Sequence, residues 1–103
     1  MQFSEREKAF EDRFAHDEEI QFKVRARRNK QVGMWAAEKL GKQGDAAHDY
    51  ADQLVIEMLD KESLLRRLHE DFARSGINVS ETQLFRQVDE LAIAARNFFM
   101  EGK

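Results

Sequence analysis

The chain has 103 residues and a formal net charge of −3, and it contains neither cysteine nor proline. This length corresponds to one domain, and the absence of cysteine excludes disulfides, thiolate zinc sites and thiol catalysis. We expect no membrane insertion, because no apolar run approaches the roughly 20 residues of a spanning helix. We expect a reducing compartment such as the cytoplasm, because the charged N-terminus lacks the apolar stretch of a secretory signal.

The first predicted helix is much longer than the others. It begins at Ser4, which forms a capping-box spacing with Glu7, and no clear stop signal precedes Gly41. A continuous helix over residues 4–40 would span roughly 55 Å, whereas helices of about 15–20 residues reach only about 22–30 Å. Its N-terminal part is therefore expected to project from the remaining helices, to be mobile or to bend.

Capping residues and glycines divide the rest of the chain into three shorter helices. The predicted N-caps of these helices are Asp45, Ser63 and Ser80. The third helix is expected to end at Ser75–Gly76, where glycine can adopt the left-handed conformation, and the last near Gly102.

Each helix carries an apolar stripe at steps of three and four residues, as a buried helix face does. Proline, which costs a helix interior about 3 kcal/mol, is absent, and no segment shows the alternation of β-branched residues typical of strands. We therefore predict an all-α protein, a four-helix bundle with short loops. The predicted core residues are Val32, Trp35, Ala36, Leu40, Tyr50, Ala51, Leu54, Val55, Met58, Leu59, Leu64, Leu65, Leu68, Phe72, Leu84, Val88, Leu91, Ala95 and Phe98.

The N-terminal segment carries an apolar line of its own, formed by Phe3, Phe10 and Phe14. A helix this short is marginal on its own. Two interpretations remain open: the three rings are anchors for a groove on a partner, or the segment folds back and completes the core. We divide the chain into an N-terminal arm, residues 1–16, and a bundle, residues 17–103.

The sequence offers little for catalysis or metal binding. It contains no phosphate-binding glycine loop and no nucleophile elbow, so we do not expect this protein to be an enzyme. The three histidines, His16, His48 and His69, lack the spacing of paired metal ligands, so we expect no metal site.

Five cations occur within residues 23–30. Arginine forks bind phosphate oxygens well, but at helical spacing these charges surround the cylinder, and Glu19 lies four residues before Lys23. An anion site and a solvated helix face both remain open. Binding to nucleic acid is not expected, because it requires a surplus of positive charge.

Two sequence blocks carry a resemblance. They are residues 3–11 (FSEREKAFE) with 14–17 (FAHD), and residues 26–30 (ARRNK) with 33–37 (GMWAA). In order and spacing they resemble the zeta-subunit family of alphaproteobacterial F-type ATP synthase inhibitors, and the likeness runs the length of the chain. Val32 and Met34 depart from the Leu-like residues expected around the glycine, which concerns packing rather than function.

The resemblance implies a four-helix protein that blocks ATP hydrolysis by the catalytic head of the F-type ATP synthase. In that family the N-terminal segment enters an α/β catalytic interface, near the rotor subunit, and stops rotation. The protein would be cytoplasmic and peripheral to the inner membrane through the synthase. Carried over to this sequence, the partner-binding residues are Phe3, Glu7, Phe10, Arg13 and Phe14.

The resemblance also implies ADP or ATP as a regulatory ligand, with no required cofactor. By residue type alone, the candidate nucleotide-binding residues are Arg27, Arg28, Asn29, Lys30 and Trp35. The alternative function is a helical bundle that senses adenine nucleotide and acts on another protein partner.

Overall fold

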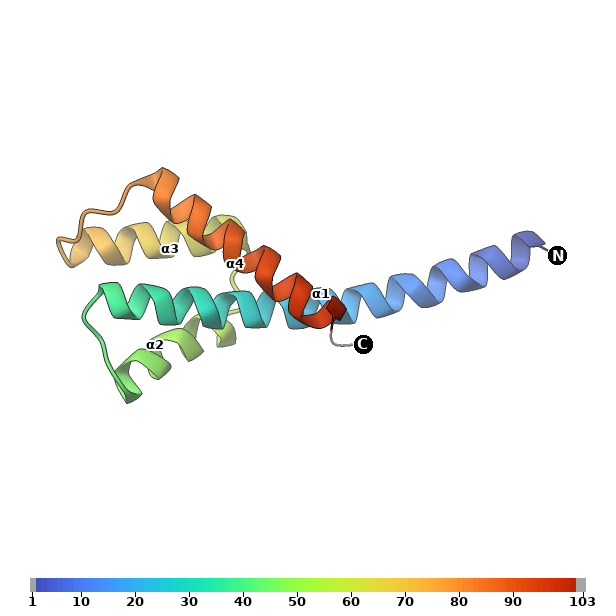
Figure 1. The fold of residues 1–103 in the computed structure, drawn as a ribbon, viewed down its shortest axis with the longest axis horizontal. Coiled ribbons are helices and arrows are strands. Elements are labelled where there is room, and N and C mark those ends of the chain that lie inside the picture. Colours follow the sequence, from blue (N-terminus) through green and yellow to red (C-terminus); the bar gives the residue numbers. More distant parts are fainter. Residues whose placement is uncertain (1, 102–103) are drawn as a thin grey trace.

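The computed structural model describes the backbone of residues 2–101 and the side chains of residues 18–100. The chain forms four helices, α1 (Gln2–Lys39), α2 (Asp45–Ile56), α3 (Lys61–Arg74) and α4 (Glu81–Glu101), joined by short connections (Figure 1). This part of the chain contains no strand. The predicted all-α four-helix bundle is confirmed.

Helix α1 organises the bundle. It packs against both α2 and α4, and α3 packs against α4. The molecule measures 62 × 27 × 22 Å along its principal axes. In Figure 1, α1 extends well beyond the other three helices, and the C-terminal end of α4 lies beside the middle of α1. The long first helix therefore has a bundled part and a part that projects.

The core lies where the four helices overlap, and most of the predicted stripes contribute to it. Its buried residues are Val32, Ala36, Leu54, Leu64, Leu68, Phe72, Leu84 and Val88. Two parts of the prediction are wrong. Phe98 is 52% exposed, because the end of α4 has only α1 beside it (Figure 1). Met58 and Leu59 lie in the connection after α2, which ends at Ile56, although both remain partly buried.

Gly33 allows α1 and α2 to pack closely. A Cβ atom at this position would lie 2.6 Å from Ala51 Cα and 2.8 Å from Ala51 Cβ. Those are backbone and near-backbone atoms, so the contact could be relieved only by moving a helix. The glycine between Val32 and Met34 is thus required by the approach of two helices.

Three of the four predicted N-caps, Ser4, Asp45 and Ser63, are wrong. Helix α2 is preceded by Gly44, with a φ of 57° and no side-chain cap, and Asp45 is instead its first residue. There its carboxylate is still favourable, because the N-terminal end of a helix carries partial positive charge. Helix α3 is capped by Asp60, whose side chain accepts a hydrogen bond from Ser63 N at 2.8 Å.

The start of α4 and the end of α3 agree with the sequence, whereas the start of α1 does not. Ser80 Oγ accepts a hydrogen bond from Gln83 N at 3.1 Å and caps α4 as predicted. After α3, Gly76 has a φ of 71° and Ile77 N donates to Phe72 O at 2.9 Å, the expected glycine C-cap. At the start of the chain, α1 begins at Gln2, so Ser4 lies inside the helix and does not precede it.

Candidate functional site

The predicted partner-binding residues all lie on the first part of α1. They are Phe3, Glu7, Phe10, Arg13 and Phe14. Their side chains are outside the described residues, as is that of His16. Their backbone belongs to one helix that continues without interruption into the bundle. The assignment of these residues stays a prediction.

The five candidate nucleotide-binding residues do not converge on one pocket. Arg27 faces α4, Arg28 and Asn29 face the connection between α2 and α3, Lys30 faces α2, and Trp35 faces α3. The placement of a nucleotide on these five residues together gains no support from the geometry.

Asn29 is a structural residue that the sequence did not reveal. It is fully buried, and its amide nitrogen donates to Leu54 O at 3.2 Å and to Leu59 O at 3.1 Å. Its Oδ1 accepts a hydrogen bond from Arg28 Nε at 3.1 Å. The sequence carried one signal for this role: Asn29 precedes Val32 by three residues and therefore extends the buried stripe of α1.

Arg28 helps Asn29 to hold the same connection. Its Nη2 donates to Leu59 O at 3.1 Å. Burial lowers the pKa of the half-buried Arg28 guanidinium, and the nearby positive charge of Arg25 lowers it further, while the Asp60 carboxylate opposes both effects. The positive charges of Arg25 and Arg28 are therefore close enough to repel each other.

Lys30 is held at the surface by α2. Its Nζ lies 2.6 Å from Asp52 Oδ1 and 3.3 Å from His48 Nδ1. Both side chains of the ion pair are substantially exposed, so we expect it to contribute less than about 1 kcal/mol.

Arg27 and Trp35 make aromatic contacts within the bundle. The Arg27 guanidinium carbon lies 3.7 Å from the centroid of the Phe98 ring. Trp35 packs edge-to-face on Phe72, with ring centroids 6.0 Å apart, and Lys39 Nζ lies 5.5 Å from the Trp35 ring centroid. The basic run is thus used largely to hold helices together.

A pocket between α1 and α4 brings several cations together. It has a volume of about 370 Å³ and is lined by the middle of α1 and the C-terminal part of α4; in Figure 1 the C-terminal end of α4 lies where α1 leaves the bundle. Its lining residues are Ile20, Gln21, Val24, Arg25, Arg28, Arg96 and Met100. Three arginine side chains around one opening are suited to bind carboxylate or phosphate oxygens. We call this site the α1–α4 pocket.

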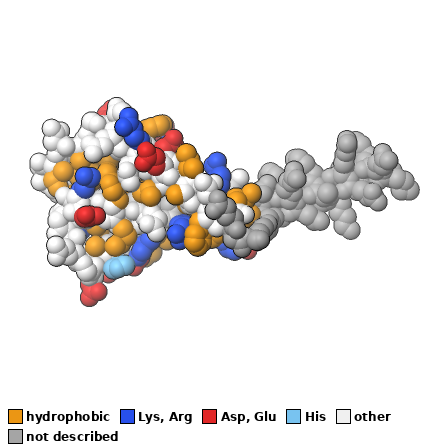
Figure 2. Space-filling view, in the orientation of Figure 1, with side chains coloured by type: hydrophobic (Ala, Val, Ile, Leu, Met, Phe, Trp, Pro, Cys, Tyr) orange, Lys and Arg blue, Asp and Glu red, His pale blue; other side chains and the backbone are white. Residues whose placement is uncertain are grey.

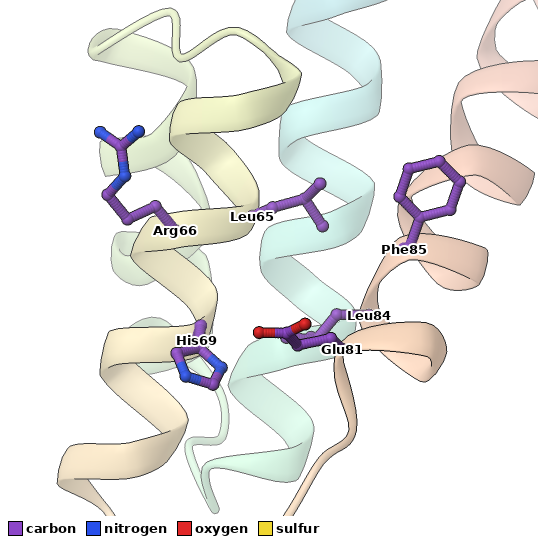
Figure 3. Close-up of a pocket in the computed structure, with 6 residues that line it drawn as sticks. All are labelled: Leu65, Arg66, His69, Glu81, Leu84 and Phe85. Carbon is purple, nitrogen blue, oxygen red and sulfur yellow. The ribbon is translucent and has the colours of Figure 1, made fainter.

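A second pocket lies between α3 and α4, at the other end of α4 (Figure 3). It measures about 340 Å³ and is lined by Leu65, Arg66, His69, Glu81, Leu84 and Phe85. Figure 3 shows Leu65 pointing toward α4, the Glu81 carboxylate on the side of His69, and Arg66 pointing away. Its charged groups do not converge, so the lining indicates no particular ligand.

The described residues contain no group of three or more histidine, aspartate or glutamate side chains that could hold a metal ion. His48 and His69 are both exposed. None of the helices, over the residues described, has the length and apolar character needed to cross a bilayer.

Comparison with known proteins identifies the family. The family model described as ATPase inhibitor subunit zeta matches residues 1–97, which is nearly the whole chain. Neither the curated proteins nor the solved structures gave a match. The matched region includes the N-terminal part of α1 as well as the bundle. The chain therefore belongs to the ATPase inhibitor subunit zeta family, which is inhibitory and regulatory rather than catalytic.

Proposed function

We propose that this chain inhibits ATP hydrolysis by the catalytic head of the F-type ATP synthase, and that residues 1–16 enter an α/β interface of the head close to the rotor subunit. The observation that carries this proposal is the family match, because it spans both the segment and the bundle. The protein would act on the cytoplasmic side, held peripherally to the inner membrane by the synthase.

The arrangement of the core supports a division of roles along the chain. Among the described side chains, the fully buried ones begin at Asn29, and those that form the core cluster come from residues 32–88. Helix α1 carries that segment away from the other helices (Figure 1). In this proposal Phe3, Phe10 and Phe14 are the apolar anchors that contact the partner, and the neighbouring Glu7 and Arg13 set the register of docking.

The test is ATP hydrolysis by a purified cognate head, titrated with the full chain and with Phe10→Ala. Loss of a buried aromatic anchor is expected to weaken inhibition by about 2 kcal/mol or more. Phe85→Ala is the matched control, because this ring is exposed near the start of α4, and the start of α4 lies far from the projecting segment (Figure 1). A full chain that does not inhibit would contradict the function, and equal inhibition by Phe10→Ala would contradict the role of the segment.

The alternative, a bundle that senses adenine nucleotide and acts on another partner, is separable in the same study. Of the five candidate residues, only Arg28 lines the α1–α4 pocket. Titration of ADP and ATP into the free chain measures this function directly. Saturable binding by a chain that leaves hydrolysis unchanged would favour the alternative over inhibition.

A further inference from the structure

We propose that the α1–α4 pocket is a second docking surface for the same ATPase head, and that it receives an acidic, partly apolar surface beside the interface that takes residues 1–16. This inference rests on the proposed function and adds to it a contact made by the folded bundle.

The position of the pocket brings it close to any partner of the N-terminal segment. Helix α1 runs without interruption from Gln2 to Lys39. Ile20, which lines the pocket, follows Phe14 by six residues, or about 9 Å at the rise of an α-helix. A protein that encloses Phe14 must therefore have its outer surface against this end of the bundle.

The pocket combines positive charge with apolar surface, as protein interfaces often do. Arg25, Arg28 and Arg96 line it together with Ile20, Val24 and Met100, and Met100 is 57% exposed. Figure 2 shows hydrophobic and basic side chains side by side at this end of the bundle. The whole chain has a net charge of −3, so the charge of this cationic cluster is opposite in sign to the net charge of the molecule.

The charge of the cluster indicates carboxylates on the partner. Arg28 is half-buried next to the like charge of Arg25. The nearby carboxylate of Asp60 already accepts a hydrogen bond from the backbone of α3. Within residues 18–100, Arg25 and Arg96 form no ion pair. Carboxylates from a partner would offset this repulsion, and the forked arginine groups would bind them in a defined geometry.

The test compares two charge-reversal variants of the full chain. The pocket variant carries Arg25→Glu and Arg96→Glu. The control variant carries Arg66→Glu, on α3, and Arg86→Glu, in the first turns of α4; both of these arginines are exposed. Both variants alter the net charge by the same amount. Circular dichroism establishes that each is folded, and inhibition of the head is then titrated at low and high salt.

The pocket variant is expected to need about tenfold more protein for half inhibition at low salt, because electrostatic complementarity raises association rates by this order or more. The control variant is expected to stay close to the parent chain. The difference should shrink as salt screens the charges.

The possible outcomes separate the two proposals. If the parent chain inhibits and both variants match it, the docking surface is wrong and the proposed function stands. If the parent chain does not inhibit, the proposed function itself fails. If the pocket variant inhibits normally but loses saturable ADP binding that the parent chain shows, the pocket is a phosphate site and the docking proposal is overturned.

Discussion

The side-chain amide of Asn29 satisfies two backbone carbonyls that the helices leave without partners. Leu54 lies in the last turn of α2, where carbonyl groups have no donor within the helix, and Leu59 lies in the connection to α3. Both carbonyls accept hydrogen bonds from the same buried nitrogen. Asn29 thereby holds the end of α2 and, together with Arg28, the connection to α3.

Replacing Asn29 with alanine tests this role. Asn29→Ala removes the donor to Leu54 O and leaves Leu59 O with Arg28 Nη2 alone, and we expect it to lower the free energy of unfolding by about 2 kcal/mol or more. Urea unfolding followed by circular dichroism measures the change. Lys30→Ala is the neighbouring control, because it removes only a surface ion pair and should cost less than about 1 kcal/mol. Equal losses in the two variants would show that Asn29 has no special part in stability.

At single residues, prediction from the sequence succeeded for most apolar positions and failed for the buried polar residue Asn29. Leu54, Leu64, Leu68 and Val88 are buried as their spacing indicated, because periodicity reports which way a side chain faces. Asn29 appeared to be one member of a basic run, since its hydrogen-bond acceptors lie 25 and 30 residues further along the chain. Local sequence carries no record of such distant partners.

At the level of helices, the approach of α1 to α2 is set by Gly33. Alanine normally favours a helix over glycine by about 1 kcal/mol. Here its Cβ would lie 2.6 Å from Ala51 Cα, so the two helices would have to separate. We expect Gly33→Ala to destabilise the fold by about 1–3 kcal/mol, the usual cost of overpacking.

Thermal unfolding of Gly33→Ala measures this effect. Gln31→Ala provides the control on the same helix, because Gln31 is exposed and its replacement adds no atom to the α1–α2 contact. A Gly33→Ala variant at least as stable as the parent chain would mean that the helices have room to move apart.

The ends of the helices were harder to predict than their existence. Ser80 caps α4 as expected, but Gly44 and Asp60 precede α2 and α3 in place of Asp45 and Ser63. Several polar residues near a helix start can each serve as the cap. The path of the preceding connection decides between them, and in α2 that path includes a φ of 57° that favours glycine.

At the scale of the whole molecule, the bundle and the projecting segment are expected to be separable. Within residues 18–100, the residues of the core cluster all follow Asn29. Deletion of residues 1–16 should therefore leave the free energy of unfolding within about 0.5 kcal/mol of the parent chain, as for changes away from buried features, while it abolishes inhibition of the head. Circular dichroism melting and the hydrolysis assay measure the two effects. Loss of the melting transition would mean that the segment belongs to the core.

The four-helix architecture was predictable from the whole sequence, but the arrangement of its surface was not. Proline-free composition, stripes and glycine positions indicate helix number and order. The α1–α4 pocket depends on Arg25 and Arg96, which are 71 positions apart in the numbering. Their meeting follows from the antiparallel return of α4 along α1, and spacing within either helix does not reveal it.

The return of α4 along α1 has a consequence for the order in which the N-terminal segment and the α1–α4 pocket form during synthesis. During synthesis α1 emerges first and α2 follows, so these neighbours in sequence can pair early, because short loops close at little entropic cost. The second wall of the α1–α4 pocket comes from the last helix of the chain. A nascent or truncated chain that lacks α4 thus carries the N-terminal segment without the pocket, and both are present only once α4 has packed on α1.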